Sequence, residues 1–163
     1  MKKILIVINS AKFFISHRIP IAVAAKKQGF DVKVALPYIS EDHKIILESE
    51  NISYKEFYLD KTGQNPFKEL LSFFSLLKLL LIVKPNVIHL VTIKPVLYGG
   101  VLGRILGIPT LVAISGMGYL YKKGKNRFLR FISNQVYKFI FSNKNVRLIV
   151  QNINDKNILN GLK

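Results

Sequence analysis

The chain has 163 residues, of which 50% are apolar and 21% are charged, a composition that excludes intrinsic disorder. It has no cysteine, which excludes disulfides, thiolate nucleophiles and cysteine-held zinc or iron–sulfur sites. Lysine and arginine number 25 against 9 aspartate and glutamate, so the net charge is +16 and favours a polyanionic partner such as nucleic acid, an anionic membrane or a phosphorylated substrate.

Short apolar runs alternate with helical patterns along the whole chain. In order they predict a strand over Lys3–Ile8, a helix from an N-cap at Ser16 to Gly29, a strand over Asp31–Leu36, a helix over Glu41–Glu50, a strand over Ile52–Leu59, a helix over Phe67–Val83, a strand over Val87–Val91, a helix over Val96–Leu106, a strand over Thr110–Ile114, a helix over Arg127–Ser142 and a strand over Val146–Val150. This alternation predicts a single Rossmann-like three-layer α/β domain with a mostly parallel six-stranded sheet. Ligands of such domains bind beyond the carboxyl ends of the strands.

The turn after the first strand, NSAKFFISHR, contains no glycine. A dinucleotide-binding domain needs G-x-G-x-x-G at this turn, so its absence argues against a nicotinamide or flavin enzyme. The turn instead offers Lys12, Ser16, His17 and Arg18 at an expected helix N-terminus. Backbone N–H groups, the helix dipole, a guanidinium and an imidazole together suit a phosphate or a sugar phosphate. The alternative is an exposed first helical turn that binds nothing.

Further candidate residues follow the later strands. Asp60, after the third strand, could hold a sugar hydroxyl, act as a base or simply cap a turn. Lys94, after the fourth strand, could neutralise a phosphate. After the fifth strand come Ser115, Gly116 and Gly118, whose glycines permit close backbone approach to a ligand or a purely conformational turn.

Other patterns predict structural roles. His89 lies inside an apolar strand and is expected to be a core residue. Gly99, Gly103 and Gly107 recur at every fourth position, which predicts close packing of a helix on the sheet. No two histidines have the spacing of metal ligands, so no metal site is expected.

A basic segment leads into an aromatic helix. Its cations are Lys122, Lys123, Lys125, Arg127 and Arg130. Cations beside aromatic side chains suit an anionic membrane surface, although a buried helix with a basic rim has the same pattern. RNA binding would need a stacking platform, which is absent, so no nucleic-acid partner is expected. The apolar stretch over residues 70–83 is too short to span a bilayer and could be a second membrane contact or could pack on the sheet.

Four blocks that together cover nearly the whole chain stand in a recognisable order. They are KKILIVIN with FFISHRIPIAVAAKKQGFDVKVALP, then YLDKTGQNPFKEL, then KPNVIHLVTIKPVLYGGVLGRILGIP, and last ISGMGY with LIVQNINDKNIL. In this order they resemble the N-terminal domain of family 4 glycosyltransferases of the GT-B fold. The most similar group builds bacterial surface polysaccharides on a polyprenyl-diphosphate carrier.

The resemblance implies that residues 1–163 form the acceptor-binding domain and that the C-terminal donor domain, which grips the nucleotide-sugar, is absent. The complete enzyme would be a hexosyltransferase without metal or further cofactor, acting on the cytoplasmic face of the plasma membrane. Its acceptor would be a polyprenyl-diphosphate-linked saccharide, and the SHR turn, the ISGMG loop and Lys94 would face the cleft between the domains.

The sequence departs from the family pattern in one respect that bears on catalysis. Many relatives carry a histidine after the fourth or fifth strand, where this chain has VTIK and ISG, so no catalytic histidine is assigned there. The chain alone is not expected to turn over. Two alternatives are a non-catalytic membrane-anchoring subunit that recruits a separate donor-binding chain, and an inactive truncated product.

Overall fold

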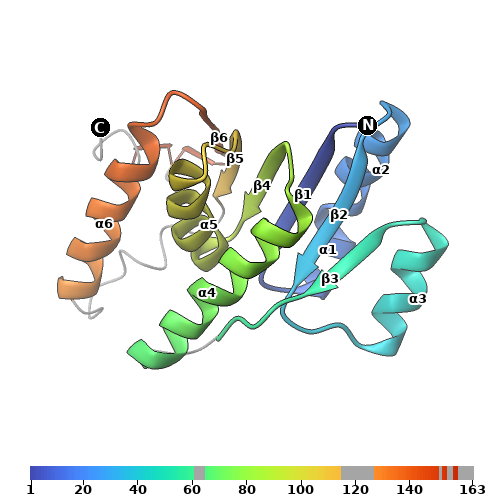
Figure 1. Cartoon of the computed structure of the whole chain (residues 1–163), viewed down its shortest axis with the longest axis horizontal. Helices are drawn as coiled ribbons and strands as arrows, with labels where there is room; N and C mark the ends of the chain where they lie inside the picture. Colours follow the sequence, from blue (N-terminus) through green and yellow to red (C-terminus); the bar gives the residue numbers. More distant parts are fainter. Residues whose placement is uncertain (61–64, 115–126, 151, 154–155, 158–163) are drawn as a thin grey trace. The chain divides into compact units, whose positions relative to one another are not determined.

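Strands and helices alternate along the chain (Figure 1). The computed structural model describes residues 1–60, 65–114, 127–150, 152–153 and 156–157, and of residues 127–129 the backbone alone. The elements are β1 (Lys3–Ile8), α1 (Ala11–His17), α2 (Ile19–Lys27), β2 (Asp31–Leu36), α3 (Glu41–Ser49), β3 (Ser53–Glu56), α4 (Pro66–Val83), β4 (Val87–Val91), α5 (Ile93–Ile105), β5 (Thr110–Ile114), α6 (Arg127–Phe141) and β6 (Val146–Val150).

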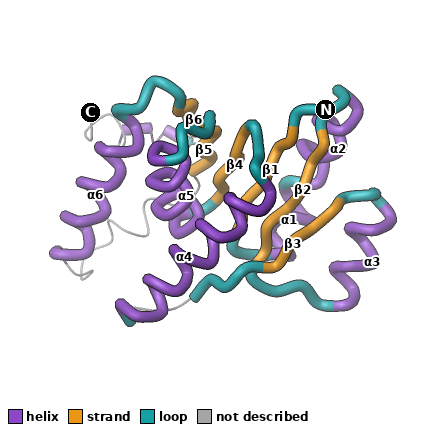
Figure 2. The backbone as a smooth tube through the Cα atoms, viewed as in Figure 1, coloured by secondary structure: helices purple, strands orange, loops and turns teal. Residues whose placement is uncertain are grey.

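The strands form a six-stranded parallel sheet in the order β3-β2-β1-β4-β5-β6. β1 pairs with β2, β2 with β3, and β5 with β6, each in parallel register. Figure 2 shows the strands in orange. The predicted Rossmann-like α/β class with a parallel sheet is therefore confirmed. The chain falls into two compact units, Met1–Ile88 and His89–Lys163, with the boundary inside β4.

The core of the first unit is built on β1 and β2. The last four residues of β1 and the last three of β2 are buried, because a parallel strand covered on both faces presents apolar side chains on both. Phe14 of α1, Ala22 of α2 and Leu76 of α4 are also fully buried. Both strands were predicted at their observed bounds.

The first helical region differs from the prediction of one helix capped by Ser16. Ser10 is the N-cap of α1, and its side chain accepts a hydrogen bond from the Phe13 amide at 3.3 Å. α1 ends at His17, and α2 begins after Arg18 with a proline in its first turn. Ser16 instead donates to the Lys12 carbonyl at 2.8 Å, one helical turn back. The prediction was wrong because two residues of equal capping propensity lie in this segment and only the earlier one caps.

Two further elements differ from their predicted bounds. β3 ends at Glu56, short of the predicted Leu59, because its pairing with β2 stops at the Leu36–Glu56 pair. α5 begins at Ile93, with Thr92 as its N-cap, and so starts three residues before the predicted Val96.

The second unit packs α5 against β5 and α6. Gly99 faces Leu90 of β4, where an added Cβ would lie 2.4 Å from a Leu90 methyl carbon, so the predicted close packing is confirmed there. Gly107 has a different role from the predicted one. It follows the helix with φ +67°, and the amides of Gly107 and Ile108 bond to the Arg104 and Gly103 carbonyls, which closes the end of α5.

None of the helices within the described ranges combines the length and the apolarity needed to cross a membrane.

Candidate functional site

Two of the predicted phosphate-binding residues, His17 and Arg18, contact one aromatic ring. The α1 cluster consists of Lys12, Phe13, Ser16, His17 and Arg18. The His17 ring stacks on Phe13 with 4.5 Å between ring centroids and 14° between planes. The Arg18 guanidinium carbon lies 5.9 Å from the centroid of the same ring. Phe13 thus contacts both an imidazole and a guanidinium near the junction of α1 and α2.

Ser16 determines which nitrogen of His17 carries the proton. Ser16 Oγ lies 2.6 Å from His17 Nδ1, and its own hydrogen is donated to the Lys12 carbonyl. A hydroxyl has one hydrogen, so Ser16 accepts at the imidazole and His17 Nδ1–H donates. The Nε2 lone pair of this exposed histidine is then available as a hydrogen-bond acceptor, which is the state a hydroxyl-bearing ligand needs.

Arg18 supplies a cation that is largely withdrawn from water. The residue is 8% exposed, and this burial lowers the pKa of its guanidinium. A guanidinium remains protonated at neutral pH, so the junction keeps a weakly hydrated positive charge. Such a charge favours anionic groups with oxygen acceptors.

The remaining predicted residues lie elsewhere. Asp60 was expected at the end of the third strand, but it lies four residues beyond β3, where its amide donates to Ser72 Oγ of α4 at 3.0 Å. Lys94 is half-buried in the first turn of α5, in the second unit. His89 is 3% exposed within β4, in agreement with a core role.

Several predicted residues lie outside the described part of the chain. They are Ser115, Gly116, Gly118, Lys122, Lys123 and Lys125, together with the side chain of Arg127. Arg130 of α6 is described and half-exposed. The predicted membrane contact of this basic segment therefore stays a prediction.

Sequence reasoning missed two residues of interest. Phe13 organises the α1 cluster, and its signal was the spacing of four residues to His17, which places both on one helical face. Thr92 has φ 74° and ψ 167°, a conformation almost confined to glycine, at the carboxyl end of β4. No sequence signal marks Thr92, because threonine is not expected at positive φ.

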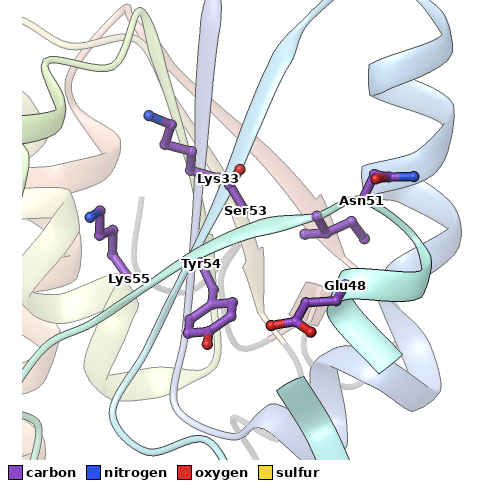
Figure 3. Close-up of a pocket in the computed structure, with 7 residues that line it drawn as sticks. Lys33, Glu48, Asn51, Ser53, Tyr54 and Lys55 are labelled. Atoms are coloured by element: carbon purple, nitrogen blue, oxygen red, sulfur yellow. The ribbon is translucent and has the colours of Figure 1, made fainter. Parts of the chain in front are cut away.

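A separate cavity of about 580 Å³ lies at the edge strand β3 and the end of α3 (Figure 3). Its polar lining is Lys33, Glu48, Asn51, Ser53, Tyr54 and Lys55. None of the predicted site residues lines it, and its charges are mixed. Within the part of the chain that the structure describes, no three histidine, aspartate or glutamate side chains come together as metal ligands.

Solved structures share the fold of this chain. Acinetobacter baumannii MurG is 19% identical over 74% of this chain and 38% of its own, with a TM-score of 0.58. The Streptomyces sp. SF2575 glycosyltransferase SsfS6 is 15% identical over 87% of this chain and 45% of its own, with a TM-score of 0.53. The UDP-GlcNAc 2-epimerase of Methanocaldococcus jannaschii is 18% identical over 100% of this chain and 43% of its own, with a TM-score of 0.59. This chain spans less than half of each.

These likenesses show the fold alone, since a transferase and an epimerase share it equally. A search of curated proteins finds no match. The family is decided by the sequence itself, because the model described as "Glycosyl transferase 4-like" matches residues 3–152, nearly the whole chain. The resemblance noted from the four sequence blocks is thereby confirmed, and the chain belongs to the glycosyl transferase 4-like family.

Proposed function

We propose that this chain is the acceptor-binding half of a glycosyltransferase that moves a sugar from a nucleotide-sugar to a polyprenyl-diphosphate-linked saccharide in bacterial surface polysaccharide synthesis. The observation that carries the proposal is the α1 cluster, where an imidazole acceptor and a buried guanidinium contact the same phenylalanine ring. An acceptor of this class offers a hydroxyl and a diphosphate, and the cluster has a group for each.

In the proposed reaction, His17 Nε2 accepts the hydrogen bond of the acceptor hydroxyl, while Lys12 and Arg18 neutralise negative charge. The hydroxyl oxygen bonds to the anomeric carbon as the bond from that carbon to the nucleoside diphosphate breaks, and the hydroxyl proton passes to His17 Nε2. Charge stabilisation of the departing diphosphate would come mostly from a donor-binding domain or a separate donor-domain chain, neither of which is represented here. We place the enzyme at the cytoplasmic face of the plasma membrane, where such an acceptor is held.

The test measures binding of a water-soluble, short-chain prenyl-diphosphate saccharide to the whole chain by calorimetry. His17→Phe keeps a ring on Phe13 but removes both nitrogens, so we expect affinity to fall about tenfold, the value of one hydrogen bond. The matched control is His43→Phe, since His43 contacts Ser40 instead of the α1 cluster. Equal affinities of the two variants would contradict the proposal.

A second function stays open as an alternative, that of a non-catalytic membrane-anchoring subunit. A chain with that function would bind anionic vesicles yet show no affinity for the soluble acceptor analogue. The same calorimetric measurement therefore separates the two functions.

A further inference from the structure

α4 is apolar on two opposite sides. One side is buried and consists of Ser72, Leu76, Leu79, Leu80 and Val83. The other side is open to solvent, and this exposed stripe consists of Phe67, Leu70, Leu71, Phe74, Leu81 and Ile82. A surface helix of a soluble domain normally shows polar residues on its outer side. The exposed stripe is therefore a feature that the fold alone does not explain.

The stripe is well exposed and runs along one side of α4, with Lys78 between Phe74 and Leu81. Its members recur at intervals of three, four and seven residues, which places them along one line of the helix. Phe67, Leu71 and Phe74 are 78%, 60% and 53% exposed. Single exposed apolar residues are ordinary, whereas a contiguous row of them marks a surface that is covered by something else.

Two serines of α4 bond to backbone groups on the side of the helix away from the stripe. Ser72 Oγ accepts from the Asp60 amide at 3.0 Å and donates to the Lys68 carbonyl at 2.8 Å. Ser75 Oγ accepts from the Tyr58 amide at 2.8 Å. Ser72 and Ser75 thus bond to the segment after β3 (Figure 1). These bonds and the burial of Leu76, Leu79 and Leu80 agree with a rotation of the helix that leaves the stripe exposed.

The charges on α4 indicate what covers the stripe. Lys68, Lys78 and Lys84 are exposed at or next to the helix, while its one acid, Glu69, is half-buried. By its spacing from Phe74 and Leu81, Lys78 stands within the stripe. If a second copy of the chain covered the stripe, the lysines of the two α4 helices would face one another and repel, in a molecule whose net charge is already +16. An anionic bilayer offers both the apolar layer and the opposite charge.

We infer that the α4 stripe lies on an anionic lipid surface, with its phenylalanine and leucine side chains at the acyl boundary and Lys78 extended to the headgroups. The inference rests on the proposed function, because an enzyme whose acceptor is anchored in a bilayer has to reach it there. It assigns the contact to α4, independently of the basic segment over residues 122–130.

The first experiment uses the absence of tryptophan from the chain. Phe74→Trp places one fluorophore in the stripe, and Ile45→Trp places one at a site of similar exposure (65%) on α3. Each variant is mixed with vesicles of phosphatidylcholine alone or with added phosphatidylglycerol. We expect the emission of Phe74→Trp to shift to the blue and to be quenched by brominated acyl chains on the anionic vesicles only. Ile45→Trp is expected to show neither effect.

The second experiment compares two charge reversals by vesicle flotation. Lys78→Glu lies in the stripe and Lys27→Glu lies on the exposed part of α2, and both give the chain the same net charge. We expect Lys78→Glu to weaken binding to anionic vesicles about tenfold and Lys27→Glu to weaken it far less. Equal losses would mean that overall charge alone drives binding, and would overturn the inference.

Two further results would overturn it. Vesicle binding without a spectral shift of Phe74→Trp would place the contact elsewhere. A dimer in lipid-free buffer that Phe74→Ser converts to a monomer would make a second copy the occupant. The acceptor analogue is soluble, so its binding does not depend on a membrane. If the chain binds the analogue but not the vesicles, this inference is overturned and the proposed function stands. If the chain binds the vesicles through the stripe but not the analogue, the proposed function is overturned and the membrane contact of α4 stands.

Discussion

Thr92 holds a backbone conformation that β-branched residues rarely adopt. Its φ of 74° and ψ of 167° cost of order 1–3 kcal/mol in a residue with a Cβ. Its Oγ1 is buried and has no hydrogen-bond partner among the described residues. The surrounding structure therefore imposes this geometry at the carboxyl end of β4, two residues before Lys94. Strain of this kind gathers at ligand-binding positions in folds of this class.

Thr92→Gly is expected to raise the free energy of unfolding by about 1 kcal/mol, because glycine adopts this conformation without strain and removes the buried hydroxyl. Urea denaturation measures the change. The control is Thr110→Gly, which removes a hydroxyl that donates to the Ile108 carbonyl at 2.9 Å and which should lower stability. A loss of stability in both variants would show that Thr92 is not strained.

At the scale of elements, the contact of α5 with α6 depends on a residue without a side chain. A Cβ added at Gly100 would lie 2.6 Å from Ile140 Cδ1 and 2.9 Å from both Cγ atoms. Ile140 is fully buried, so it has little room to move. Arg104 strengthens the same contact, since its guanidinium lies 4.2 Å from the Phe139 centroid and bonds to Ser142 Oγ at 2.6 Å.

Gly100→Ala is expected to lower the free energy of unfolding by about 1–2 kcal/mol, because overpacking outweighs the higher helix propensity of alanine. The double variant Gly100→Ala with Ile140→Val should recover part of the loss, and a double-mutant cycle by urea denaturation measures this coupling. Gly107→Ala, with positive φ and no atom within 4 Å of the added Cβ, should destabilise without coupling to Ile140. Additive effects of the Gly100 and Ile140 changes would argue against the tight contact.

At the scale of the whole molecule, positive charge is the dominant feature. Twenty-five cations face nine acids, so most cations have no acid to pair with. Described ion pairs such as Lys44–Glu41, at 2.6 Å, lie at the surface, and the hydrogen bond to Glu41 raises the pKa of Lys44. Exposed pairs contribute little stability, so mutual repulsion of the cations outweighs them.

We expect the melting temperature to rise by several degrees as salt increases from about 0.01 to 0.15 M, since the Debye length falls from ~30 to ~8 Å and repulsion is screened. Scanning calorimetry measures the shift. At a pH near the isoelectric point of about 10.1 the same titration should have little effect, because the net charge is close to zero. A melting temperature that falls with salt at neutral pH would mean that attractive pairs dominate.

The sequence alone determined the fold class, the five strands other than β3 at their observed bounds, and the core position of His89. These follow from apolar runs and periodicity, which depend on neighbours in the chain. It also identified Lys12, Ser16, His17 and Arg18 as one group, because they are adjacent in sequence. Their expected setting at one helix N-terminus was wrong for Ser16 and His17, which lie in the last turn of α1, whereas Lys12 lies in the first turn of α1 and Arg18 is the N-cap of α2.

Tertiary structure alone decided the features that depend on distant residues. β3 ends where β2 stops pairing with it. α4 buries Leu76, Leu79 and Leu80 and leaves Phe67 and Phe74 exposed. Thr92 adopts its conformation under the constraint of its surroundings. A local pattern predicts that a helix or strand will form. Contacts made by residues far apart in the chain decide where that element ends and which of its faces remains exposed.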